Sequence, residues 1–79
     1  MSERLKRLAV NDEGFLFDPV TGESYTVNPV GATIIKLLKE GGSAPQNVEA
    51  LVSAFDVGQE EAERDLNDFL AHLRSLKLI

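Results

Sequence analysis

The last quarter of the chain carries one apolar stripe that predicts a long helix. Over about four turns, apolar side chains recur at helical spacing, at Ala62, Leu66, Phe69, Leu70, Leu73 and Leu76. Carboxylates crowd the start of this segment and basic residues lie near its end, which favours a helix through its macrodipole. Because a helix with one apolar face must bury that face, the rest of this 79-residue chain has to fold against it.

Two shorter helices are predicted before this one. Asn28 is a favourable N-cap, and Pro29 suits the first helical position. Gly41-Gly42 predicts where this helix ends, and Ser43 with Gln46 forms a capping box for the next helix. Each helix has its own apolar face, the first at Val30, Ile34, Leu37 and Leu38 and the second at Val48, Leu51, Val52 and Phe55.

The first third of the chain predicts strands. Short apolar or alternating stretches at residues 8–10, 14–18 and 23–27 are separated by segments rich in Asn, Asp, Pro and Gly, which form turns. These features predict an antiparallel meander. The fold class is therefore α+β, with the element order βββααα in a winged helix-turn-helix-like arrangement. We expect one domain over residues 1–79, with residues 1–7 disordered.

Composition argues against several classes of function. The net charge is −5, with 8 basic and 13 acidic residues, and such a balance repels nucleic-acid phosphates. The basic cluster of Arg4, Lys6 and Arg7 is interpreted as a solvated terminal segment. No stretch approaches the roughly 18 apolar residues that cross a bilayer, and the start does not have the pattern of a signal peptide. We expect a cytoplasmic protein without a nucleic-acid or membrane partner.

The chain offers little catalytic chemistry. His72 is its single histidine and cysteine is absent, so carboxylates alone would have to hold a metal ion. Asp65 and Asp68 share one edge of the last helix, where a solvated face is the simpler interpretation. The glycines form no phosphate-binding motif, although Gly31 in the first helical turn could mark a close helix contact. We expect a protein without enzymatic activity, catalytic residues, metal or cofactor.

An exposed strand edge remains as a candidate for binding. The segment Ser24 to Val27 is neutral, favours β-structure and lacks proline, so its edge is not protected by charge or by a missing donor. It could accept an extended peptide by strand addition. It could also pair with a second copy of the chain, or be a short edge strand without a partner.

Three parts of the chain resemble the PqqD family, in the same order and at similar spacing. They are the turn Asp18-Pro19-Val20-Thr21-Gly22 followed by Tyr25, the segment Asn28-Pro29-Val30-Gly31-Ala32 followed by Ile34-Ile35-Lys36-Leu37-Leu38 and Gly41-Gly42, and the segment Phe55-Asp56-Val57 followed by Glu60-Glu61-Ala62-Glu63-Arg64-Asp65-Leu66, Phe69, Leu70 and Leu73. The resemblance runs from about Leu8 to Ile79. Members of this family are small winged helix-turn-helix domains called RiPP recognition elements.

The resemblance implies a function. Such a domain is a peptide chaperone that binds the leader segment of a ribosomally made precursor peptide and presents it to a modifying enzyme, often a radical S-adenosylmethionine (SAM) maturase. The leader is expected to add to the third strand and to lie against the third helix. The implied contacts on the strand are Glu23, Ser24, Tyr25, Thr26 and Val27, and those on the helix are Asp65, Asp68, Phe69, His72 and Leu73.

The chain departs from the family pattern at a few packing and capping positions, namely Ile35, Gly58 and Ala44-Pro45. These departures leave open whether the pathway is pyrroloquinoline quinone synthesis or the synthesis of another peptide product. Two alternative functions are a winged-helix regulator that binds nucleic acid and a structural subunit of an enzyme complex. The acidic start of the last helix argues against the first, because a recognition helix would place Glu60 and Glu61 against phosphates.

Overall fold

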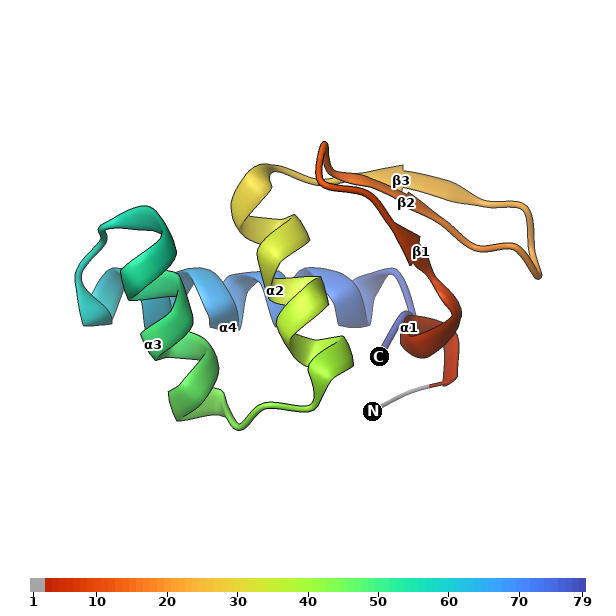
Figure 1. The fold of residues 1–79 in the computed structure, drawn as a ribbon. Helices are drawn as coiled ribbons and strands as arrows, with labels where there is room; N and C mark the ends of the chain where they lie inside the picture. The colour runs from red at the N-terminus through yellow and green to blue at the C-terminus, as the bar shows by residue number, and fades with distance from the viewer. Residues whose placement is uncertain (1–2) are drawn as a thin grey trace.

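The computed structural model describes residues 3–79. A short helix, α1 (Glu3–Arg7), precedes three antiparallel strands, β1 (Ala9–Val10), β2 (Phe15–Phe17) and β3 (Ser24–Thr26), and three helices follow, α2 (Pro29–Glu40), α3 (Ala44–Phe55) and α4 (Gln59–Ser75). The strands lie in the order β1-β2-β3. Figure 1 shows the sheet at one end of the molecule and α3 at the other, with α4 running behind α3 and α2 and below the sheet. The predicted α+β class and the order of strands before helices are confirmed.

The predicted helix boundaries are confirmed by their caps. The Asn28 side chain accepts a hydrogen bond of 2.8 Å from the Gly31 N–H at the start of α2. Gly41 ends that helix with a φ of 82°, in the left-handed region that glycine adopts without strain. Ser43 and Gln46 form both hydrogen bonds of a capping box at the start of α3. Local sequence therefore determines where these helices begin and end.

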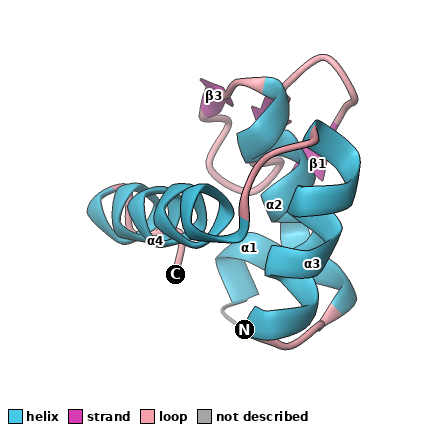
Figure 2. Cartoon of the chain, turned by 90° about the vertical axis from the view of Figure 1, so that its left-hand side faces the viewer, coloured by secondary structure: helices cyan, strands magenta, loops and turns pink. Residues whose placement is uncertain are grey.

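The apolar core consists of two clusters that meet on α4. One cluster joins the sheet and α1 to the C-terminal half of α4, and the other joins α2 and α3 to its N-terminal half. Leu38 and Phe69 pack against both clusters. Figure 2 shows α4 on one side of α2 and α3, with β3 above it. The long helix predicted from the apolar stripe is thus the element on which both halves of the fold pack.

The N-terminal segment differs from its prediction. Residues 3–7 form α1, where disorder and a solvated basic cluster were expected, and residues 1–2 of that segment lie outside the described part of the chain. Two interactions hold α1 in place. Leu5 is buried in the core, and Arg7 makes a bidentate pair with the buried Asp18, in which Nε and Nη2 each lie 3.0 Å from a carboxylate oxygen. These interactions are long-range, so the local sequence gave no sign of them.

Asp18 is the centre of a polar network inside the first third of the chain. Besides its pair with Arg7, its Oδ1 accepts hydrogen bonds from the backbone N–H groups of Val20 and Thr21 at 2.9 and 3.4 Å. The Arg7 guanidinium and these N–H groups hold the pKa of the Asp18 carboxyl well below its usual range, against the opposing effect of burial. The ionised carboxylate therefore connects α1 to the turn between β2 and β3.

We expect this network to make stability depend on pH. Because the folded pKa of Asp18 is depressed, its contribution is fully present above the unfolded value of about 4. That contribution is lost as the pH falls below 4 toward the folded pKa. Asp18→Asn should thus lower stability clearly at neutral pH and by a smaller amount in acid, as measured by urea unfolding at several pH values. Glu13→Gln, at an exposed position, is the control and should change stability little at any pH. An equal deficit for Asp18→Asn at all pH values would contradict this account.

Candidate functional site

The edge of β3 has backbone groups that point away from the sheet. The Asp18 N–H donates to the Glu23 carbonyl at 2.9 Å, and the Val27 N–H donates to the Gly14 carbonyl at 2.8 Å. In an antiparallel ladder hydrogen-bonded and non-hydrogen-bonded pairs alternate, and the register pairs Leu16 with Tyr25 and places Ser24 and Thr26 between the bonded pairs. The N–H and C=O groups of Ser24 and Thr26 therefore point outward, where no neighbouring strand of the three-stranded sheet pairs with them.

The side chains of the predicted strand segment alternate as expected. Tyr25 and Val27 are partly buried against the core, while Ser24 and Thr26 are exposed. The Tyr25 hydroxyl donates to Glu23 Oε2 at 2.5 Å, and the nearby Glu23 carboxylate raises the pKa of Tyr25, with burial acting in the same direction. This hydrogen bond fixes the Tyr25 side chain at the start of the free edge.

A hollow of about 290 Å³ lies between the start of α2, with its cap Asn28, and α4. It is lined by Asn28, Val30, Gly31 and Ile34 from α2 and its cap, and by Asp65, Asp68, Phe69 and His72 from α4. The structure thus brings together four of the five helix residues predicted for the site. The α2 residues were not predicted as site residues. The one sequence signal for them was Gly31, which was interpreted as a close helix contact.

Gly31 connects the hollow to β3. A Cβ atom at this position would lie 2.7 Å from Phe69 Cε1, closer than real Cβ atoms approach their neighbours, and 3.1 Å from Val27 Cβ, which is a tight contact. The absence of a side chain lets α2 pass between the end of β3 and the Phe69 ring. The predicted close contact at Gly31 is confirmed, and it brings Val27, the residue that follows β3, against the α2 wall of the hollow.

Leu73 lies elsewhere than predicted. It was expected to contact a bound peptide, but it is fully buried in the cluster that contains Leu16 and Leu78. On α4 it lies one turn after Phe69 and faces the sheet, so it packs behind the hollow and does not line it. Periodicity alone placed both residues on one apolar face and could not show which of them reaches the surface.

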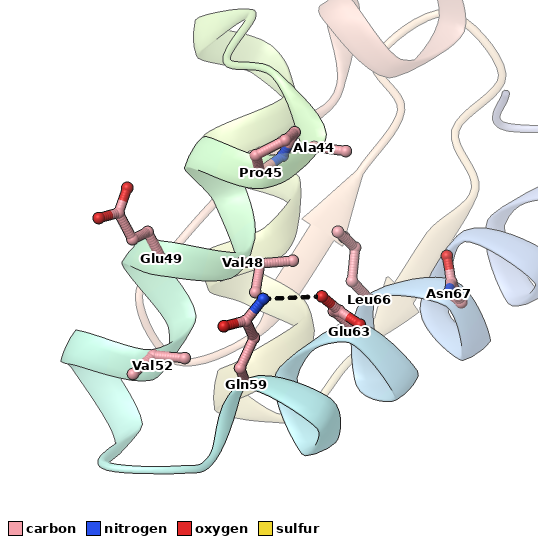
Figure 3. Close-up of a pocket in the computed structure, with 9 residues that line it drawn as sticks. All are labelled: Ala44, Pro45, Val48, Glu49, Val52, Gln59, Glu63, Leu66 and Asn67. Atoms are coloured by element: carbon pink, nitrogen blue, oxygen red, sulfur yellow. Dashed lines mark hydrogen bonds between the residues drawn. The ribbon is translucent and has the colours of Figure 1, made fainter.

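A second and larger hollow lies on the other flank of α4. It has a volume of about 610 Å³ and is lined by Ala44, Pro45, Val48, Glu49, Val52, Gln59, Glu63, Leu66 and Asn67 (Figure 3). Gln59 Nε2 donates to Glu63 Oε1 at 3.1 Å across one turn of α4 at its mouth. None of the predicted site residues lines it. Its size is therefore weaker support for function than the strand edge beside the smaller hollow.

Within residues 3–79, the structure contains neither a cluster of metal ligands nor a helix suited to a bilayer. No group of three or more His, Asp or Glu side chains in this part of the chain is arranged to hold a metal ion. No helix within it is both long enough and apolar enough to span a bilayer.

We expect Gly31→Ala to reshape the hollow. Alanine in a helix usually stabilises by about 1 kcal/mol over glycine, but here the new Cβ must displace the Phe69 ring. The variant should remain folded, gain less than that amount in the free energy of unfolding, and shift the ring resonances of Phe69 in an NMR spectrum. Gly58→Ala is the control, because its Cβ meets no atom within 4 Å, and it should leave those resonances in place. Full stabilisation with an unmoved Phe69 ring would contradict the packing described here.

Comparison with known proteins places the chain in a family. The family described as Coenzyme PQQ synthesis protein D (PqqD) matches residues 13–79. No curated protein matches the chain. Among solved structures, the one titled "TbiB1 in Complex with the TbiA(beta) Leader Peptide" is similar, with a TM-score of 0.76 and 33% sequence identity over 90% of this chain and 84% of that one. With most of its length matched by the family, this chain belongs to the PqqD family.

Proposed function

We propose that this chain is a non-catalytic module that binds the leader segment of a ribosomally made precursor peptide and presents the peptide to a modifying enzyme. The observation that carries the proposal is the free edge of β3 beside the hollow on α4. Membership of the PqqD family supports it, as does the similar structure, whose title describes TbiB1 in complex with a leader peptide. Such a module acts in the cytoplasm, where precursors are made.

Strand addition explains how this surface recognises a peptide. The leader main chain pairs with the outward N–H and C=O groups of Ser24 and Thr26, which supplies affinity for any extended segment. Alternate leader side chains then point toward α4, where Asp65, Asp68 and Phe69 line the hollow. Glu23, Tyr25 and Val27 complete the strand segment that the leader joins, and His72 lines the hollow together with Asp68 and Phe69. Leu73 supports the hollow from the core.

A module that presents a precursor peptide needs a modifying enzyme as its partner. A radical SAM maturase is the partner that the family resemblance implies, and another peptide-modifying enzyme would use the module in the same way. The free edge of β3 also allows a homodimer by edge-to-edge pairing. A leader peptide would compete with that dimer, because both need the outward groups of Ser24 and Thr26.

The proposal is tested by NMR titration with the leader of a precursor peptide encoded beside this chain. We expect amide shifts over residues 23–27 and 65–73, where the peptide binds, and the smallest shifts over residues 48–55 of α3. Sedimentation of the same samples distinguishes peptide binding from dissociation of a dimer. The largest shifts on α3, with β3 unchanged, would show that strand addition is the wrong mechanism even if the peptide binds tightly.

Proline substitution tests the outward donors directly. Ser24→Pro and Thr26→Pro each remove an N–H that points away from β2, so the ladder within the sheet stays intact. Each variant should bind the leader about fivefold more weakly, which corresponds to about 1 kcal/mol for a lost hydrogen bond. Ser24→Ala and Thr26→Ala keep the N–H and should bind like the unmodified chain. A circular dichroism spectrum must show that each proline variant is folded; full affinity in both of them would contradict the proposal.

Nucleic-acid binding is the alternative that the winged-helix arrangement suggests. The exposed start of α4 carries Glu60, Glu61 and Glu63, which would face phosphates with like charge. We expect no specific complex with duplex DNA at physiological salt, measured by fluorescence anisotropy. Specific binding in the sub-micromolar range would contradict the proposed function.

A further inference from the structure

The hollow beside β3 combines an apolar floor with an acidic wall. Ile34 is fully buried, and Val30 and Phe69 are partly buried, so the base of the hollow is apolar. Asp65 is partly exposed and Asp68 is exposed, and both line the hollow from α4. A side chain that fills this hollow must therefore be apolar, and its neighbours must face carboxylates.

The acidic wall continues along α4. Glu61, Asp65, Asp68 and His72 follow one another at spacings of four, three and four residues. At about 100° per residue they fall within a sector of roughly 60° and form one line along the helix flank. The two aspartates and Glu61 make no ion pair with any described residue, and Arg64, one turn before Asp68, does not pair with it. The carboxylates of Glu61, Asp65 and Asp68 therefore form no ion pair with any Lys or Arg of residues 3–79.

Several cations of the chain are held elsewhere. Arg4 and Arg7 surround Asp18, Lys36 pairs with Asp12, and Lys39 donates to the Leu8 carbonyl at 2.6 Å. None of them lines the hollow. Because no ion pair of the described residues neutralises this wall, a cation supplied by a ligand can pair with it.

Strand geometry sets where that cation lies. In an extended peptide on β3, side chains on one face recur every second residue, about 6.6 to 7 Å apart. Along α4, Asp65 and Asp68 are about 4.5 Å apart in rise, and Glu61 lies about 6 Å before Asp65. One inward leader side chain can thus fill the hollow while the next inward side chain, two positions away, reaches a carboxylate of the wall.

We propose that the leader recognised by this chain carries an apolar side chain that fills the hollow and, two positions away, a lysine or arginine that pairs with Asp65 and Asp68. This inference rests on the proposed function and names the chemistry of its ligand. The charge pair serves mainly for selection, because complementary charges suppress wrong partners more than they add affinity. Leaders with acidic residues at that position are rejected by repulsion.

A peptide display selection tests the inference without knowledge of the natural precursor. A library of random peptides is selected against the unmodified chain, against Asp65→Lys/Asp68→Lys, and against Glu60→Lys/Glu63→Lys. The last variant has the same change in net charge, but its substitutions lie away from the line, with Glu63 at the other hollow. Amide shifts at β3 identify those selected peptides that bind by strand addition, and a circular dichroism spectrum confirms that each variant is folded.

We expect peptides from the unmodified chain and from the Glu60/Glu63 variant to be enriched in Lys or Arg two positions from an apolar residue. The Asp65/Asp68 variant should select Asp or Glu at that position and bind the basic peptides at least about tenfold more weakly. Peptides that bind at β3 without basic enrichment, or with the same preference in all three selections, would overturn this inference and leave the proposed function standing. A selection that yields no peptide bound at β3 would overturn both.

Discussion

The fold depends on one helix, α4, which packs against two separate apolar clusters. The apolar stripe of α4 packs against the sheet and α1 along its C-terminal half, and against α2 and α3 along its N-terminal half. Phe69 lies where the two clusters meet, and Gly31 of α2 leaves the space that its ring occupies. A hollow remains at this junction, between the start of α2 and α4. The candidate site is thus a consequence of how two small cores share one helix.

Local sequence patterns predicted the helices well because their boundaries are set locally. The caps at Asn28 and Ser43 and the glycine after α2 act within a few residues, and each has the predicted geometry. The strand parity of β3 was also predictable in part, since alternation separates Tyr25 from its neighbours. What the sequence left open was which groups point outward, because that depends on the register with β2. Two backbone hydrogen bonds, at Glu23 and at Val27, decide it.

The features that sequence reasoning missed all depend on contacts between distant residues. Helix α1 is held by Leu5 in the core and by Arg7 on Asp18, a partner beyond β1 and β2. Leu73 and Phe69 belong to the same periodic stripe, yet Leu73 is fully buried in the cluster that contains Leu16 and Leu78, while Phe69 stays partly open. The α2 side of the hollow could not be predicted because its residues carry no charge and form no motif. Only the approach of Gly31 to Phe69 brings that side to the site.

The proposed binding mode separates affinity from selectivity. The outward backbone groups of β3 are the same for every peptide, so strand pairing supplies affinity that depends little on sequence. Discrimination has to come from side chains, and in this chain it falls to α4, whose flank is rigid because the opposite face of the helix is buried in both clusters. A change on that flank alters which peptides fit without disturbing the strand edge. In the proposed mode, the residues that select the peptide are therefore not those that hold its main chain.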